Sequence, residues 1–234
     1  EVVLAGLVVV QLGALGVWAL NGGRLRDLGV RLDRRSARQL ALGAAGGASA
    51  AGVIALILII TGWASGGELS WTARQIAIGL IVQQAVVAAI EELAFRGVMQ
   101  PTLSAVWGRW RGLAATAILF GLFHLPNIIY QEVPRALIPT TVVSLTIMGI
   151  AFGLAAYGTR GGLALPTGLH FGWNVIAYGF EDGIAPAFTG PQWITGAPEW
   201  FPESGLLGLA GLAVLSAIIY RALAVSDRSN AGIG

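Results

Sequence analysis

The sequence predicts an all-α fold, a polytopic integral membrane protein built as a helical bundle. Of its 234 residues, 56% are hydrophobic and only 11% are charged, whereas a soluble domain carries about 25% charged residues. The mean hydropathy is +0.75, and apolar stretches recur at the length of roughly 20 residues that a membrane-spanning helix needs. We therefore expect one transmembrane domain over residues 1–234 with about seven spans.

The predicted spans are Val2–Leu20, Leu40–Gly62, Arg74–Gly97, Gly112–Ile129, Leu137–Tyr157, Leu163–Phe180 and Gly205–Leu223. The first span lacks a basic segment before its apolar run, which favours a membrane helix over a signal peptide. Small residues recur in Leu40–Gly62 and in Gly149-x-x-x-Gly153. This pattern is typical of helices that pack closely within a membrane.

The charges of the loops predict one orientation in a cell membrane. Cytoplasmic loops carry an excess of basic residues, and alternate loops hold the arginines Arg24, Arg26, Arg31, Arg34, Arg35, Arg38, Arg109, Arg111, Arg160, Arg221 and Arg228. The other loops hold Glu68, Glu132 with Arg135, Glu181, Asp182, Glu199 and Glu203. Tryptophans mark both interfaces, with Trp63, Trp71, Trp193 and Trp200 outside and Trp107 and Trp110 inside. We expect the amino terminus outside and the carboxyl terminus in the cytoplasm.

Two classes of site are excluded by composition. The chain has no cysteine, so it has neither disulfides nor a thiolate nucleophile nor a thiolate metal site. The net charge of +2 is too small and too scattered to indicate nucleic-acid binding.

An acidic pair and an arginine interrupt an apolar stretch at Glu91-Glu92-x-x-x-Arg96. Ionisable groups inside a membrane mostly pair, line a wet cavity or do chemistry. Glu92 and Arg96 lie four residues apart on one helix face, which predicts an ion pair. Glu91 points about 100° away and is left for general acid–base work, unless an arginine from another helix pairs with it. Pro101 is expected to end this helix near Gln100.

The only two histidines also lie in apolar segments, as Phe120-x-x-x-His124 and His170-x-x-x-Asn174. Pro126 is expected to kink or end the first of these helices, and Pro166 is suited to the first turn of the second. His170 then lies near the positive end of the helix dipole, which favours a neutral imidazole. Together His170 and Asn174 would supply two donors for an oxyanion hole. The alternative is that these polar side chains only join helices.

With the predicted orientation, the three elements can meet in a cavity that opens to the cytoplasm. The sequence contains no His-Glu-x-x-His zinc motif and no Gly-x-Ser-x-Gly elbow. No intramembrane aspartate pair occurs either. Serine-type and aspartyl-type proteolysis are therefore disfavoured.

In order, the three motifs resemble the signature motifs of the CPBP family, which groups CAAX prenyl endopeptidases with Abi-type membrane proteases. The resemblance covers Glu91 to Asn174 and implies intramembrane proteolysis of a membrane protein or of a lipidated or peptide substrate. It implies that Glu91 and His124 activate a water, and that His170 and Asn174 hold the oxyanion. Glu92 and Arg96 would support this site.

The resemblance also leaves a zinc-dependent variant open, with Glu91, His124 and His170 as ligands, because two His and one Glu form a legitimate catalytic zinc set. We favour the mechanism without metal or other cofactor, since Asn174 beside His170 fits a donor pair and is a poor zinc ligand. Two alternatives from other classes are a proton-coupled transporter and a non-catalytic immunity protein. The sequence has no repeated half, which disfavours the transporter.

Overall fold

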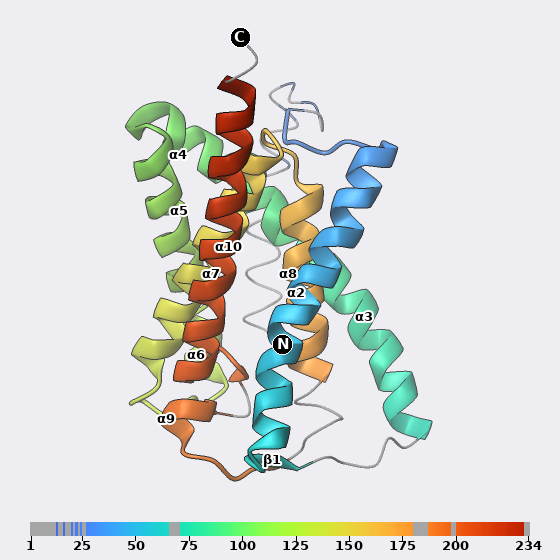
Figure 1. The fold of residues 1–234 in the computed structure, drawn as a ribbon, viewed down its shortest axis with the longest axis vertical. Coiled ribbons are helices and arrows are strands. Elements are labelled where there is room, and N and C mark those ends of the chain that lie inside the picture. The colour runs from blue at the N-terminus through green and yellow to red at the C-terminus, as the bar shows by residue number, and fades with distance from the viewer. Residues whose placement is uncertain are drawn as a thin grey trace.

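The computed structural model describes residues 27–65, 71–179, 187–197 and 200–231, together with a few isolated positions before residue 27. Within these residues, long helices run side by side as a bundle (Figure 1). The predicted span Val2–Leu20 lies outside the described residues apart from isolated positions, as do the loop residues Arg26, Glu68, Glu181, Asp182 and Glu199. The predicted all-α fold is confirmed. Besides helices, the described residues contain two short antiparallel strands of two residues each, which pair Ala64 with Phe188 and Ser65 with Ala187.

The described elements are α2 (Arg34–Ile60), β1 (Ala64–Ser65), α3 (Trp71–Glu92), the π-helical segment η1 (Leu93–Met99), α4 (Gln100–Trp107), α5 (Arg109–Phe123), α6 (Leu125–Tyr130), α7 (Ile138–Gly158), α8 (Ala164–Gly179), β2 (Ala187–Phe188), α9 (Gln192–Thr195) and α10 (Leu206–Ala231).

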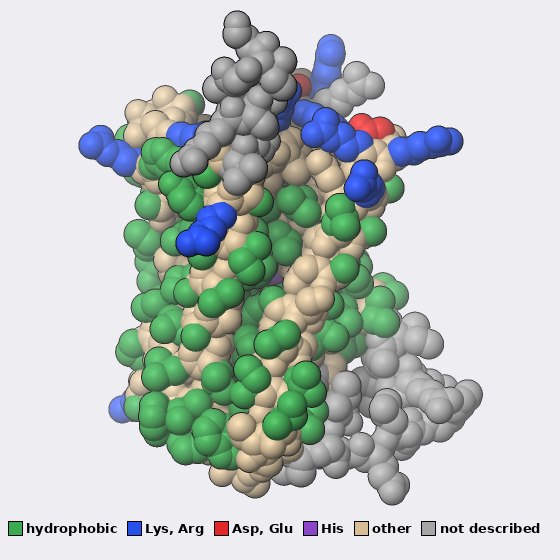
Figure 2. All heavy atoms as spheres, in the orientation of Figure 1, with side chains coloured by type: hydrophobic (Ala, Val, Ile, Leu, Met, Phe, Trp, Pro, Cys, Tyr) green, Lys and Arg blue, Asp and Glu red, His purple; other side chains and the backbone are tan. Residues whose placement is uncertain are grey.

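Four helical stretches of the described chain are long and apolar enough to cross a membrane, namely Arg34–Ile60, Arg109–Tyr130, Ile138–Gly158 and Leu206–Ala224. Their outward faces carry large exposed apolar side chains such as Ile60, Val214 and Ile218, and hydrophobic atoms cover much of the surface in Figure 2. Water disfavours such a surface, whereas lipid accommodates it. The chain is therefore a polytopic membrane protein. At 16 residues, α8 is shorter than the roughly 20 residues of a full span.

Arginine side chains gather at one end of the bundle (Figure 2). They lie where α2 and α5 begin and where α7 ends, and include Arg34, Arg38, Arg109 and Arg160. At the opposite end, Arg135 lies in the turn between α6 and α7. We refer to the first of these as the arginine-rich end.

Prolines shape the helices that carry the polar motifs. The break predicted at Pro126 is confirmed: α5 ends at Phe123, and Pro126 lies in the first turn of the short helix α6. Pro166 lies in the first turn of α8, as expected. Pro101 does not end a helix. It lies in the first turn of α4, and η1 connects that turn to α3. The π-helical segment η1 runs directly into α4, where the N–H of Gln100 donates to the carbonyl of Phe95, so the chain stays helical past Pro101.

Helices α2 and α8 cross in backbone contact, which fixes the helix that carries His170. The contact uses Gly43 and Gly47 of α2 against Gly168 and Gly172 of α8. A Cβ on Gly47 would overlap the carbonyl of Leu169, and one on Gly172 would overlap the carbonyl of Ala44. The small-residue packing predicted for this span is therefore observed, with α8 as the partner.

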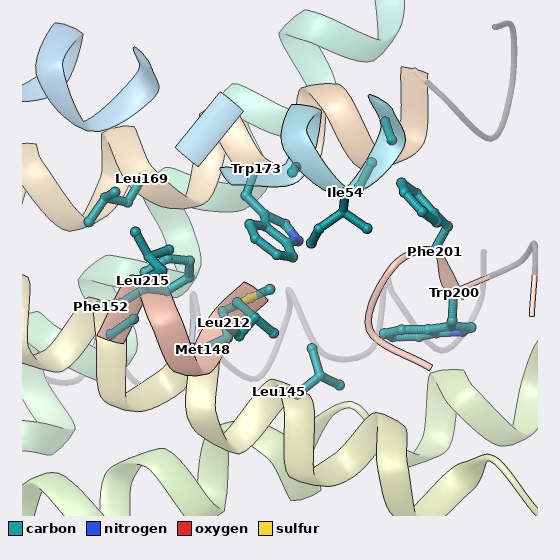
Figure 3. Close-up of a cluster of buried hydrophobic side chains, with 14 of the residues drawn as sticks. Ile54, Leu145, Met148, Phe152, Leu169, Trp173, Trp200, Phe201, Leu212 and Leu215 are labelled. Carbon is teal, nitrogen blue, oxygen red and sulfur yellow. The ribbon is translucent and has the colours of Figure 1, made fainter. Parts of the chain in front are cut away.

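The buried core lies between α2, α7, α8, α10 and the segment before α10 (Figure 3). Trp173 of α8 packs beside Ile54 of α2, while Met148 and Leu212 join α7 to α10. Trp173 and Phe152 are each 1% exposed. This apolar core surrounds the polar residues described next and holds their helices in register.

Candidate active site

Glu92 and Arg96 form the expected ion pair at the junction of α3 and η1. Glu92 Oε1 lies 2.9 Å from Arg96 Nη1, and both side chains are fully buried. Arg96 also donates to the carbonyl of Gly149 over 3.1 Å, and its guanidinium lies over the ring of Phe120 at 4.5 Å from the centroid. A buried arginine is tolerated only with such compensation. The pair therefore anchors α3 to α5 and α7.

Glu91 faces the two histidines. Its side chain is 10% exposed, and its Oε2 lies 3.7 Å from Nε2 of His124 and 3.9 Å from Nε2 of His170. No group of the described chain hydrogen-bonds to this oxygen. Among the described residues, no arginine forms an ion pair with Glu91, and its close contacts with titratable side chains are to these two histidines.

His124 is oriented by the break between α5 and α6. Its Nδ1 lies 2.7 Å from the carbonyl oxygen of Phe120. A carbonyl only accepts, so Nδ1 carries the proton and a neutral His124 presents the lone pair of Nε2 to Glu91. The Phe120-x-x-x-His124 spacing therefore orients the ring through a main-chain oxygen.

His170 is oriented by Glu92. Its Nδ1 lies 3.0 Å from Glu92 Oε1, and its ring stacks on Phe152 with centroids 5.0 Å apart. Because Glu92 also pairs with Arg96, the carboxylate accepts and His170 donates from Nδ1. A neutral His170 would then present a lone pair at Nε2, and only an imidazolium can donate from that nitrogen as well.

Asn174 lies one turn after His170 on α8 and is held by a glutamine. Its Nδ2 donates to Oε1 of Gln84 over 2.9 Å. Gln84 lies two turns before Glu91 on α3 and is 3% exposed. One Nδ2 hydrogen of Asn174 is therefore engaged, and the second remains for another acceptor.

A cavity of about 260 Å³ brings these groups together. Side chains from α3, α5, α6, α7, α8 and the segment before α10 line it: Gln83, Gln84, Val87, Glu91, Phe120, His124, Asn127, Tyr130, Gln131, Leu145, Met148, His170, Asn174, Ala177, Tyr178, Trp200, Phe201 and Glu203. The predicted convergence of Glu91, His124, His170 and Asn174 on one cavity is observed.

The cavity extends away from the arginine-rich end. Its lining includes residues of α6 and of the segment before α10, which lie at the other end of the bundle (Figure 1). It reaches the surface at Gln83 and Tyr130, which are exposed. Towards the arginine-rich end, Phe95, Arg96 and Phe152 are each at most 2% exposed and close the bundle. The predicted opening at the arginine-rich end is therefore not observed, because the Glu92–Arg96 pair and its aromatic neighbours fill that space.

Residues 73–176 match the family model described as Type II CAAX prenyl endopeptidase Rce1-like. This segment is similar to the Rce1-like CAAX prenyl endopeptidases. No curated protein and no solved structure matches the chain. The Rce1-like segment contains all three polar motifs, from Glu91 to Asn174, so the resemblance predicted from them is confirmed. Proteins of this family are intramembrane proteases, and the prediction of an enzyme is confirmed with it.

The Rce1-like segment does not offer a preformed metal site. Among the described residues, no group of three or more His, Cys, Asp or Glu side chains has the spacing of metal ligands. The proposed zinc ligands Glu91, His124 and His170 face one another at 3.7 and 3.9 Å. Donors bound at about 2.0–2.2 Å to one tetrahedral zinc ion lie roughly 3.3–3.6 Å from one another, only a few tenths of an ångström less than these separations. The zinc alternative therefore stays a prediction.

Some residues of the Rce1-like site were not singled out from the sequence. Gln84 could have been predicted as a site residue, because it precedes Glu91 by seven residues and so lies on nearly the same helix face. Glu203 could not, since the composition of its loop is typical of an acidic exterior loop. Trp200, assigned above to an interfacial belt, is 7% exposed and lines the cavity. No sequence pattern placed Glu203 or Trp200 in the cavity that contains His124.

Proposed function

We propose that the chain is an intramembrane endopeptidase that hydrolyses a peptide bond with a water molecule activated by Glu91 and His124. The observation that carries this proposal is the buried Glu91 Oε2, which lacks a hydrogen-bond partner and faces Nε2 of both histidines at 3.7 and 3.9 Å. Separations of that length are too long for direct hydrogen bonds and suit a bridging water.

In this mechanism the water donates one hydrogen bond to Glu91 and the other to Nε2 of His124. As the water oxygen bonds to the carbonyl carbon, Glu91 takes its proton and the carbonyl electron pair moves to oxygen. When the carbon–nitrogen bond breaks, Glu91 returns that proton to the leaving nitrogen. The products are a carboxylic acid and an amine, and Glu91 is again a carboxylate.

His170 and Asn174 are the proposed donors to the oxyanion. Asn174 has one free Nδ2 hydrogen once Gln84 has accepted the other. His170 can donate from Nε2 only as an imidazolium, because its Nδ1 faces Glu92. This differs from the neutral imidazole expected from the helix dipole, because the contact of Nδ1 with Glu92 leaves Nε2 as the nitrogen that faces the cavity. Donors placed where negative charge develops are typically the largest single contribution to such a reaction.

The proposed setting is a single transmembrane domain of about seven spans, with the arginine-rich end in the cytoplasm. The amino terminus would then lie outside and the carboxyl terminus inside the cell. Glu91 would lie within the bilayer, and the cavity would be entered from the non-cytoplasmic half. The substrate class is a peptide segment of a membrane protein or of a lipidated peptide, as the family description suggests.

The test is Glu91→Gln in the full-length chain, reconstituted in liposomes with a library of end-blocked peptides whose cut sites are read by mass spectrometry. We expect kcat to fall by about 10²–10⁴ while the melting temperature is retained. Glu132→Gln, at an exposed acid, is the matched control. Full activity of the Glu91 variant would rule out the mechanism. Proton-driven uptake by liposomes that show no cleavage would favour the transporter.

A further inference from the structure

Glu203 is a buried acid in the catalytic cavity that the proposed hydrolysis does not use. It is 6% exposed and lines the same cavity as Glu91, His124 and Asn174. Its Oε1 accepts a hydrogen bond from the indole N–H of Trp173. None of the arginines or histidines in the described chain forms an ion pair with it. A carboxyl group in such a place has a donor but no counter-ion.

The surroundings of Glu203 disfavour a carboxylate in the cavity. Burial raises the pKa of Glu203 to about 8, against the opposing effects of the Trp173 hydrogen bond and of its own backbone N–H. A positively charged group brought into contact would reverse this, because an opposite charge favours the ionised acid.

Trp200 places an aromatic wall beside this acid. It lies three residues before Glu203 in the turn that leads to α10, and both side chains line the cavity. The ring of Trp200 contacts that of His124 with centroids 6.1 Å apart, so this wall adjoins the catalytic groups. A carboxylate together with an indole face is a combination that binds ammonium and guanidinium groups.

The turn that carries both residues is held in place. Ser204 is fully buried, and its hydroxyl donates to the carbonyl of Trp200 over 2.8 Å. The same hydroxyl accepts from the backbone N–H of Ala197 over 2.7 Å. A fixed turn makes a subsite of defined position, because little ordering is needed when a ligand binds.

We propose that Glu203 and Trp200 form a subsite for a basic side chain of the substrate, lysine or arginine. This inference rests on the proposed endopeptidase function and names its substrate preference. The lining contains no arginine or lysine, and its two histidines already face Glu91 or Glu92, so no separate cation is present for a negatively charged substrate group. A basic side chain near the cleaved bond would have Glu203 as its counter-ion.

The experiment compares end-blocked peptides that differ only in lysine or norleucine at each position around a cut site taken from the peptide library. For wild-type protein in liposomes, we expect kcat/KM to favour lysine by at least about tenfold at one position, the scale of a charged hydrogen bond. Glu203→Gln should bring this ratio to about one, and Glu203→Lys should favour glutamate over norleucine at the same position. Glu132→Gln, at an exposed acid outside the cavity, should leave the ratio unchanged.

An equal lysine-to-norleucine ratio of kcat/KM in wild-type protein and in Glu203→Gln would contradict the subsite and leave the endopeptidase proposal unaffected. Binding of fluorescent lysine and norleucine peptides to Glu91→Gln protein separates the two proposals. If wild-type protein shows no cleavage, a lysine preference in binding that disappears in Glu91→Gln/Glu203→Gln would support the subsite and reject the mechanism. If Glu203→Lys fails to fold, Trp200→Leu should reduce the lysine ratio by at least about threefold, and an unchanged ratio would contradict the proposal.

Discussion

Glu92 Oε1 lies 3.0 Å from Nδ1 of His170, although 78 residues separate them. The same oxygen lies 2.9 Å from Nη1 of Arg96. One carboxylate oxygen therefore joins α3, η1 and α8, and it sets which nitrogen of His170 faces Glu91. This contact couples the stability of the bundle to the orientation of the proposed oxyanion donor.

Glu92→Gln should destabilise the protein by about 3–5 kcal/mol, because the change leaves Arg96 buried without its counter-ion. Unfolding measured in detergent would quantify the loss. Replacing both residues, as Glu92→Gln/Arg96→Met, should recover part of it, since no unpaired charge remains. Destabilisation in the double variant equal to the sum of the single ones would show that the pair is not coupled.

Gln84→Met should lower kcat by about tenfold to a hundredfold with a smaller effect on KM, because Asn174 loses the acceptor that orients its amide. Peptide cleavage kinetics provide the measurement. Asn174→Ala alone and Gln84→Met/Asn174→Ala should give similar rates, since both remove the oriented donor. Val86→Met, at an exposed position of the same helix outside the cavity lining, is the control. Additive effects of the Gln84 and Asn174 changes would contradict this positioning role.

Gly47→Ala should destabilise the bundle by about 1–3 kcal/mol, because its Cβ would overlap the carbonyl of Leu169 on α8. Gly52 lies on the same helix, and a Cβ added there would meet no atom of another helix within 4 Å. Gly52→Ala is therefore a matched control expected to be neutral or slightly stabilising. Thermal unfolding of both variants in detergent makes the comparison. Equal stability of the two would show that the close crossing of α2 and α8 is not required.

The orientation can be tested with introduced cysteines, because the chain has none of its own. Arg35 lies exposed at the arginine-rich end and Ala136 lies exposed in the turn before α7. In intact cells, a membrane-impermeant maleimide should label Ala136→Cys, while Arg35→Cys should react only after the membrane has been permeabilised. The reverse pattern would place the cavity entrance on the cytoplasmic side.

The sequence predicted the membrane fold and the polar motifs well, because both depend on local chemistry. A run of apolar residues long enough to cross a bilayer satisfies its own backbone as a helix, and residues four apart share a helix face whatever surrounds them. The Glu92–Arg96 pair and the break at Pro126 followed from spacing alone. The same spacing left Glu91 without an intrahelical partner and so suggested the role that we propose for it.

The direction of the cavity and part of its lining depended on tertiary structure. The sequence shows that His170 and Glu92 are polar groups in apolar spans, but their contact needs α8 to cross α2 and lie against α3. Glu203 and Trp200 come from a loop whose composition is typical of an exposed surface, yet its turn folds inward against Trp173 and His124. Loop burial is decided by packing between distant segments, which no local pattern encodes, whereas helix faces are fixed by the 3.6-residue period.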